Sequence, residues 1–314
     1  MTCRRCNHMA RKFGRYGKRH IQRYRCAICK LTFSDEAPRL GTHYTDPETA
    51  AKALQLMLEG MSVRAISRFT GLHKHTILAL MCTASESAAH ALDRIRGIHS
   101  EHVQCDEIWT FVGKKQKQVR KADSPELGDQ WVFVAIDADT KLIPCFALGK
   151  RSRETTERFI GDLQGRLTDE RFQLTTDGFH FYERAVENIF AGQADFAQLV
   201  KLYGDYGQHG YERYSPGRIT EVISKVRDGN PDPKHISTSY IERSNLSLRM
   251  GVRRFTRLTN AYSKKLANLK AALTLWFAFY NYCRVHTSLR VTPAMQAGLT
   301  DHVWSVGELL TPGR

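Results

Sequence analysis

Four cysteines near the N-terminus constrain the fold more than any other feature of the chain. Cys3-x2-Cys6 is followed, after nineteen intervening residues, by Cys26-x2-Cys29, and this spacing is typical of a zinc site. Two such knuckles place four thiolates on tight turns, where they can close a tetrahedral shell around Zn²⁺. The metal replaces the hydrophobic core that some forty residues cannot build. We therefore expect residues 1–40 to form a zinc ribbon with a structural metal.

The cysteine pattern leaves some alternatives open. The two CxxC motifs could be redox dithiols or a chance pairing, and His8 or His20 could substitute for one of the four ligands. The other four cysteines lie in apolar contexts, where a thiol behaves as a small buried hydrophobe. They are Cys82, Cys105, Cys145 and Cys283.

The segment after Thr45 has the spacing of three helices separated by glycines. Apolar residues are in helical register over 47–59, 63–69 and 73–82, with Gly60 and Gly71 between them. This order predicts a helix-turn-helix DNA-binding domain over 41–95, with 62–67 in the supporting helix. An ordinary helical hairpin is the alternative. The residues expected to open the recognition helix are His73, Lys74, His75 and Thr76.

The rest of the chain reads as a mixed α/β domain over 96–290, followed by a C-terminal tail over 291–314. A three-stranded meander that leads into α/β alternation indicates a mixed sheet flanked by helices. A segment rich in Gly, Tyr, Pro and charge, 204–236, interrupts this order and is expected to be an insertion or mobile loop. The expected strands are 102–112, 130–137, 141–148, 172–176 and 196–203, and the expected helices are 154–167, 179–190 and a core helix around 271–280.

Three acidic residues lie where such a fold could gather them. Asp106 follows the β-like run 102–105, Asp177 ends the run 172–177, and Glu242 lies near the start of a helical pattern. Carboxylates at strand ends sit where ligands bind in open α/β sheets. Oxygen ligands of this kind suit Mg²⁺ or Mn²⁺, and a carboxylate-held pair of such ions can drive in-line displacement at phosphorus.

Each acid also has a structural explanation. An Asp at a strand end is commonly a turn residue, and Ser239-x-x-Glu242 fits a helix capping box. Glu107 is a competitor of Asp106, but alternation along a strand puts the two on opposite faces, so that at most one is expected to point into a common site. Asp137 is a second competitor, and it is expected to lie in a hairpin turn.

The charge of the chain indicates a polyanionic partner. The 47 Lys and Arg residues exceed the 32 Asp and Glu residues by 15, and residues 1–40 hold eleven basic residues against two acids. Aromatic residues such as Tyr24 and Phe255 interleave with the basic clusters, which favours nucleic acid over a merely solvated face. The second cluster comprises Arg243, Arg249, Arg253, Arg254, Arg257, Lys264 and Lys265.

Membrane and secretory functions are not expected. No stretch reaches the eighteen or more apolar residues of a membrane span, and the N-terminus lacks the apolar segment of a signal peptide. We expect a cytoplasmic protein.

Taken together, these motifs resemble the insertion-sequence-one family of DDE transposases over nearly the whole chain. The resemblance lies in the four-cysteine ribbon, the helix-turn-helix, residues 106–109, residues 176–178 and residues 241–249. The ending 280–289, followed by Thr292-Pro293-Ala294, is similar to the ending common among bacterial transposases and integrases.

The resemblance implies an RNase H-like catalytic domain in which Asp106, Asp177 and Glu242 bind Mg²⁺ or Mn²⁺. Asn245 and Arg249 lie three and seven residues after Glu242, near the same helix face. With Arg243, they are candidates for contacting the scissile phosphate or the transferred end.

The implied activity is cleavage at terminal inverted repeats and strand transfer into target DNA, by a homodimer or higher oligomer on double-stranded DNA. The alternatives are a catalytically silent DNA-binding regulator and an RNase H-like structure-selective nuclease.

Overall fold

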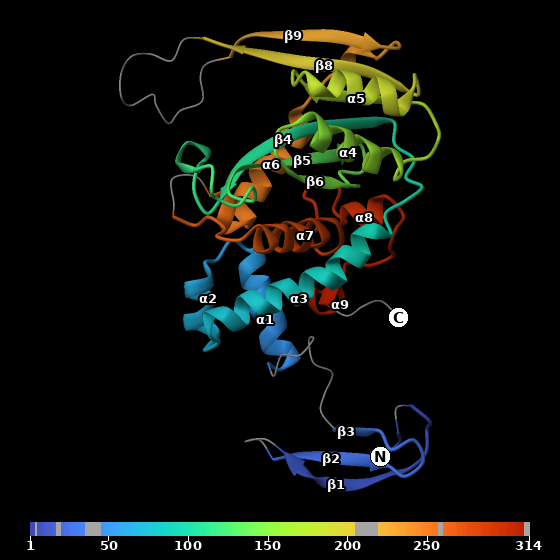
Figure 1. Ribbon diagram of the computed structural model, residues 1–314. Coiled ribbons are helices and arrows are strands. Elements are labelled where there is room, and N and C mark those ends of the chain that lie inside the picture. The colour runs from blue at the N-terminus through green and yellow to red at the C-terminus, as the bar shows by residue number, and fades with distance from the viewer. Residues whose placement is uncertain (4, 17–19, 35–44, 205–218, 257–259, 311–314) are drawn as a thin grey trace. The chain divides into compact units, whose positions relative to one another are not determined.

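A computed structural model describes residues 1–3, 5–16, 20–34, 45–204, 219–256 and 260–310. The chain forms two compact units, Met1–Ala50 and Ala51–Arg314, and each is described by itself (Figure 1). Across the described residues, no helix has the length and apolar character needed to cross a membrane.

The first unit contains a three-stranded antiparallel sheet. Its strands follow one another in space as they do in sequence: β1 (Ala10–Tyr16), β2 (Ile21–Cys26) and β3 (Thr32–Ser34). Each CxxC knuckle is followed by a residue with positive φ, Asn7 at 54° and Lys30 at 61°. Each knuckle is also closed by a backbone hydrogen bond, because Cys3 N donates to His8 O and Cys26 N donates to Leu31 O. The two turns therefore have the same design.

A six-stranded mixed sheet organises the second unit (Figure 1). Its spatial order is β6-β5-β4-β7-β8-β9, in which β4, β7 and β8 are parallel and the other neighbours antiparallel. The strands are β4 (His102–Val112), β5 (Gly128–Asp137), β6 (Phe146–Gly149), β7 (Phe172–Asp177), β8 (Ala194–Tyr203) and β9 (Ile219–Asp228).

Alternation along β4 assigns its side chains to two layers. Val103 and Cys105 join the hydrophobic core beneath α4 (Arg153–Gln164) and α5 (Phe181–Phe190). Gln104 faces the other way and accepts hydrogen bonds from α6 (Ser239–Gly251). The sheet is thus covered by α4 and α5 on one face and by α6 on the other.

The core under α4 and α5 is aromatic. Phe133 of β5 lies at its centre, within 6.4 Å of the rings of Phe179 and Tyr182 and 5.8 Å from that of Phe159. All four side chains are buried. Aromatic pairs at these spacings add to the stabilisation from area burial, so this core holds β4 and β7 rigidly side by side.

Helices at the start and end of the second unit pack together. After α1 (Pro47–Leu58) and α2 (Val63–Thr70), the long α3 (Lys74–Asp93) packs along α7 (Leu266–Tyr282). Ser62 caps α2, and Gly71 ends it with φ of 72°. The short elements are the 3₁₀ turns η1 (Gln116–Gln118), η3 (Pro233–His235) and η4 (Arg253–Phe255), and the helices α8 (Pro293–Gln296) and α9 (Val306–Leu310).

The predicted mixed α/β sheet is confirmed, with local corrections. The strand expected over 141–148 is confined to β6, and the helix expected over 73–82 continues to Asp93 because Ala84, Ala88 and Ala91 extend its buried face. The segment expected to be an insertion contributes an edge strand, since β9 pairs with β8 through Val200 and Ile223. Residues 205–218 of that segment lie outside the described residues. The division into zinc ribbon, helix-turn-helix, catalytic domain and tail stays a prediction.

Candidate active site

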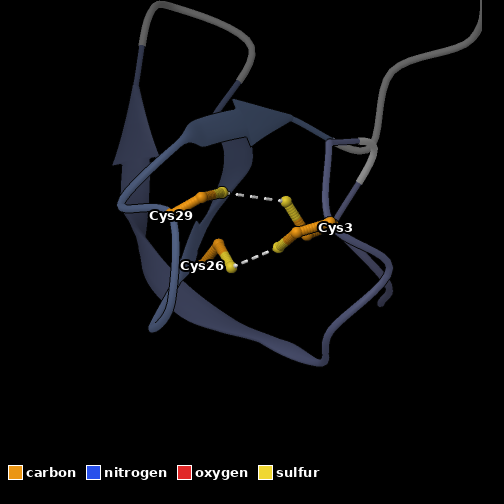
Figure 2. A group of neighbouring side chains, drawn as sticks. Cys3, Cys26 and Cys29 are labelled. Carbon is orange, nitrogen blue, oxygen red and sulfur yellow. Dashed lines mark hydrogen bonds between the residues drawn. The ribbon is translucent and has the colours of Figure 1, made fainter.

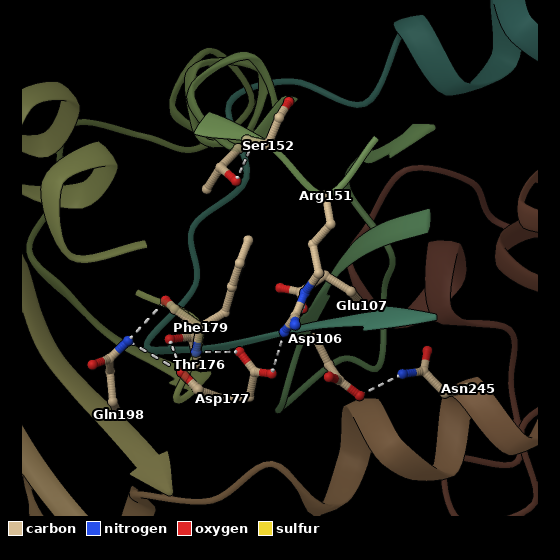
Figure 3. A network of polar contacts seen from close by, with 10 residues as sticks. Asp106, Glu107, Arg151, Ser152, Thr176, Asp177, Phe179, Gln198 and Asn245 are labelled. Atoms are coloured by element: carbon tan, nitrogen blue, oxygen red, sulfur yellow. Dashed lines mark hydrogen bonds and ion pairs between the residues drawn. The ribbon is translucent and has the colours of Figure 1, made fainter. Parts of the chain in front are cut away.

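Asp106 and Asp177 lie together because their strands are parallel neighbours. The register pairs Cys105 of β4 with Thr176 of β7, so the aspartates that follow these two residues lie at the same level along the two strands. Asp177 also acts as a turn residue, since its Oδ1 accepts a hydrogen bond from Phe179 N at 3.0 Å. Its other oxygen remains at the shared edge, and Figure 3 shows the two carboxylates side by side.

Glu242 reaches these acids from α6, which lies on the face of the sheet that Gln104 and Asp106 of β4 also face. It lies in the first turn of α6 and, with Asp106 and Asp177, lines one cleft of about 550 Å³. Its Oε1 accepts from the Thr238 hydroxyl at 2.5 Å and pairs with the Lys201 ammonium of β8. The structure thus brings all three predicted acids to one cleft.

The capping box predicted for Ser239 and Glu242 is wrong. Thr238 is the N-cap of α6, and Ser239 is already the first helical residue. The first-turn N–H groups of Tyr240 and Ile241 instead donate to the Gln104 side chain of β4, at 3.0 and 3.1 Å. Because the Gln104 side chain accepts the hydrogen bonds of these first-turn N–H groups, the Glu242 carboxylate is not needed as a helix cap and is available in the cleft.

Asn245 fixes the orientation of Asp106. Its Nδ2 donates to Asp106 Oδ2 at 2.7 Å, one turn of α6 after Glu242 (Figure 3). Burial raises the pKa of Asp106 to about 7, and the negative charges of Asp177 and Glu242 add to this effect. Burial likewise raises the pKa of Asp177, against the opposing hydrogen bond from Phe179 N and the charge of Arg151. These carboxylates are crowded enough that cations would stabilise their ionised forms.

Glu107 is part of the cluster, contrary to the expectation from strand alternation. One ligand oxygen each from Asp106, Glu107 and Asp177 lies within 4.8 Å of the other two. Although its backbone position faces the α4 and α5 layer, its side chain brings a carboxylate oxygen to the two aspartates. Burial, followed by the charge of Asp177, raises the pKa of Glu107 to about 8. The Tyr182 hydroxyl adjoins this carboxyl and lowers its pKa, yet within the described structure neither that hydroxyl nor Glu107 Oε1 has a well-formed hydrogen bond.

Two cations at the site were not predicted. The Arg151 guanidinium lies 3.0 Å from Glu107 Oε2 and 3.6 Å from Asp177 Oδ2, and it stacks over the rings of Trp131 and Phe179 at 4.7 and 3.9 Å. Lys201 is the other cation. Neither belongs to a local motif, because Arg151 precedes α4 and Lys201 ends an ordinary strand pattern. Only the assembled sheet brings them to the acids.

Asp137 has the structural role that was expected of it. Its two carboxylate oxygens accept from Asp139 N at 2.9 Å and from the Thr140 hydroxyl at 2.6 Å. It is buried at the turn after β5. Asp137 therefore shapes a turn and is no competitor for the cleft.

The residues proposed to contact DNA occupy three places. His73 caps α3 through Nδ1, and His73, Lys74 and His75 are exposed at that helix start, while Thr76 is half-buried. Arg243 is exposed on α6 and Arg249 is half-buried there. The structure brings Lys74 and His75 together with Arg253 and Arg254 along a second cleft.

The four N-terminal cysteines form one cluster, shown in Figure 2. All four sulfurs lie within 4.8 Å of one another, with Cys3 to Cys29 and Cys6 to Cys26 at 3.4 Å. The backbone N–H of Arg5 donates to Cys3 Sγ and lowers the pKa of Cys3 to about 6. Four converging cysteine sulfurs are the donor set that structural Zn²⁺ takes, with bonds to sulfur of about 2.3 Å. His8 and His20 are not members of this cluster.

Comparison of the sequence with protein-family models and with curated proteins finds no match. Among solved structures, the chain is similar to a piggyBac transposase synaptic complex with hairpin DNA, with a TM-score of 0.39 and 10% identity over 88% of this chain and 71% of that chain. It is also similar to the Mos1 strand transfer complex, with a TM-score of 0.30 and 12% identity over 88% of this chain and 78% of that chain.

Proposed function

We propose that this chain is a DNA transposase of the DDE type, with an RNase H-like catalytic domain. The observation that carries the proposal is the convergence of Asp106, Asp177 and Glu242 on one cleft from two parallel strands and a helix. The strand order, with an antiparallel meander β6-β5-β4 beside parallel β7 and β8, supports the RNase H-like assignment. The resemblance of the sequence motifs to insertion-sequence-one transposases supports a bacterial insertion sequence as the source.

In this proposal Asp106, Asp177 and Glu242 hold two Mg²⁺ or Mn²⁺ ions. When bound, the ions would activate the attacking oxygen and stabilise the leaving oxygen at the scissile phosphate. Oxygen-only donors and raised carboxyl pKa values fit such ions. Glu107 adds a fourth carboxylate beside them.

The chain's own residues prepare the site for this chemistry. Asn245 holds Asp106 in one orientation, and Arg151 restrains Asp177 from the opposite side. Lys201 pairs with Glu242 Oε1, so a metal bound by that oxygen would displace the ammonium, which lines the same cleft and would then be free to meet a phosphate oxygen. Water would attack the phosphorus at the element end and break its P–O3′ bond, which leaves a 3′-hydroxyl on the element and a 5′-phosphate on the flanking DNA. That hydroxyl would then attack a phosphorus of the target strand, form the new P–O3′ bond and displace the target's own 3′-oxygen.

DNA recognition is assigned to the N-terminal parts of the chain. The four-cysteine cluster would hold structural Zn²⁺, and α2 and α3 would act as a helix-turn-helix that presents His73, Lys74, His75 and Thr76 to the terminal inverted repeats. Because two ends are joined to one target, we propose a homodimer or higher oligomer on DNA.

The test is cleavage and joining of a supercoiled plasmid that carries the gene's flanking ends. Wild type should cut and join with Mg²⁺, and Asp177→Asn or Glu242→Gln should lower cleavage roughly 100-fold or more, the scale of removing one group that stabilises the transition state directly. Glu187→Gln, an exposed acid on α5 outside the cleft, is the matched control and should retain activity.

One observation favours the silent regulator as a second candidate. The ion pair of Lys201 with Glu242 ties up one of the three carboxylates. Tight binding of the ends without cutting under any divalent metal would support that interpretation. Cutting of branched or unrelated DNA without joining would instead support a structure-selective nuclease.

A further inference from the structure

A second cleft, separate from the carboxylate site, lies within the Ala51–Arg314 unit. It has a volume of about 810 Å³ and is bounded by the starts of α2 and α3 and by the chain that follows α6. None of the described residues that line it is acidic, and six carry basic groups. These are Arg64, Lys74, His75, Arg253, Arg254 and Lys264.

The cations of this cleft lack countercharges from the protein. Within the described part of the chain, none of the five Lys and Arg side chains takes part in a salt bridge, although other cations such as Arg151 and Lys201 do. Arg254 is half-buried, and burial lowers its pKa. A guanidinium withdrawn from water without a carboxylate costs free energy, which a bound anion would offset.

The apolar residues that line the cleft indicate which kind of anion fits it. Met57, Leu58, Leu78 and Leu275 also line it, so the cleft offers apolar surface as well as basic groups. A small inorganic anion would leave that surface uncovered. A sugar–phosphate backbone presents negative charge and apolar surface in alternation, because deoxyribose faces lie between its phosphates.

The cleft also lies between the start of α3 and the end of α6, the helix that carries Glu242. Lys74 and His75 belong to the first turn of α3, whereas Gly251 and Val252 end the helix that carries Glu242. From Glu242 to Val252 the helix rises roughly 15 Å, at 1.5 Å per residue. The chain between α1 and α2 lies close to the C-terminal end of α6, since a Cβ added at Gly60 would lie 2.5 Å from the Met250 carbonyl oxygen.

We propose that this cleft binds the backbone of a DNA duplex beside the bases that α3 contacts. It adds Arg64 and Lys264 to the DNA-binding surface and places the bound backbone at the far end of the catalytic helix. The identity of the ligand as DNA rests on the proposed function.

The test measures binding of fluorescent duplexes by anisotropy across a salt series, without added Mg²⁺ so that no cutting occurs. The probes are the gene's flanking end and a random duplex of equal length. The variant combines Lys74→Gln, Arg253→Gln and Lys264→Gln. Its matched control combines Lys117→Gln, Lys121→Gln and Arg184→Gln, which removes the same charge at exposed positions outside the cleft.

We expect the cleft variant to bind both duplexes at least tenfold more weakly at physiological salt. The slope of log affinity against log salt should fall by about 0.9 for each phosphate that the variant no longer neutralises, or roughly 2.7 for three. Weaker backbone binding should affect both probes alike, and the control should stay within twofold of wild type. A tryptophan unfolding curve checks that the variant is folded.

Equal affinity and slope for the folded cleft variant and wild type would overturn the inference, as would a weakening no greater than in the control. Failure of the proposed function looks different, because wild type would then bind DNA through the cleft without cutting plasmid. Cutting by wild type together with unchanged binding by the cleft variant would remove the inference alone.

Discussion

At the scale of single residues, the site contains carboxyl groups so close together that their negative charges repel one another. Asp106 and Glu107 are adjacent in sequence, and burial raises their pKa values to about 7 and about 8. Without metal, the folded protein therefore retains protons on this pair that the unfolded chain would release. Their ordinary pKa values are near 4.

This predicts that the metal-free protein loses stability as the pH rises. A carboxyl whose pKa is raised by folding costs nothing below its unfolded pKa, and the cost grows from about pH 4 until the folded pKa is passed near pH 8. We expect the free energy of unfolding to fall by a few kcal/mol between pH 5 and 8, since a tenfold difference in proton affinity between the folded and unfolded chain corresponds to about 1.4 kcal/mol. Urea denaturation followed by tryptophan fluorescence measures it.

Glu107→Gln is the informative variant, because it keeps the shape of the side chain and removes one titrating group. Its stability should depend less steeply on pH than that of wild type, whereas Glu187→Gln on exposed α5 should leave the dependence unchanged. Stability that stays flat from pH 5 to 8 in wild type would contradict the assignment. Added Mg²⁺ should restore stability at pH 8 if the ionised acids bind it.

The sequence predicted Asp106, Asp177 and Glu242 because each has a local signal, either a β-like run that ends at the acid or a helix start. It named Glu107 only as a competitor of Asp106 and set it aside, because alternation describes where a side chain leaves the backbone and not how far it reaches. Arg151 and Lys201 were missed for another reason. Each lies in an unremarkable local sequence and meets the acids only through pairing of distant strands.

At the scale of secondary-structure elements, α6 is held between the sheet and α7. Its N-terminus is fixed by Gln104, and its C-terminus abuts the next helix so closely that a Cβ at Gly251 would lie 2.0 Å from the Trp276 ring. Glycine is required there for space. The helix can therefore sit deep enough for Glu242 and Asn245 to reach the strand edge.

Gly251→Ala should destabilise the protein by about 1–3 kcal/mol, the usual cost of forcing an extra carbon into a packed interior. Thermal unfolding measures the change. Gly161→Ala in α4 is the matched control, because a Cβ there meets nothing within 4 Å. That control should be neutral or stabilising by up to about 1 kcal/mol, since alanine is the better helix former. Equal effects of the two substitutions would rule out the packing argument.

Most elements were predictable because their apolar period is local, as in β4 and α7. The edge strand β9 was not, since most of its side chains are exposed and lack the buried alternation that identifies a strand. The full length of α3 was also missed. Its second half is rich in small residues, whose burial depends on the distant α7.

At the scale of the whole molecule, the two units are stabilised in different ways. The Ala51–Arg314 unit has an aromatic core, whereas in the Met1–Ala50 unit Cys3, Cys26 and Ala10 are the buried apolar residues of the three-stranded sheet region. Metal binding should therefore contribute folding free energy to the first unit and not to the second.

Cys26→Ser should abolish tight binding of one equivalent of zinc and unfold the first unit. All four tryptophans lie after residue 50, so the tryptophan unfolding midpoint should stay within about 2 °C of wild type, which corresponds to no more than about 1 kcal/mol in a large domain. Zinc content and fluorescence melting measure the two effects. Cys82→Ala, outside the cluster, should keep its zinc, and a large change in the tryptophan transition of Cys26→Ser would mean that the units are thermodynamically coupled.

The pairing of Arg151 and Lys201 with the site acids also bears on how the protein assembles. Asp106, Asp177 and Glu242 line one cleft, and Glu107 lies beside the two aspartates, so these four carboxylates repel one another. A chain that needed metal to overcome this repulsion could not complete its sheet until an ion arrived. Here the side chains of Arg151, just before α4, and of Lys201, in β8, supply the countercharge. The carboxylates of this unit can thus be held together by the chain's own cations, and a metal ion bound by Glu242 Oε1 would displace Lys201 from that oxygen.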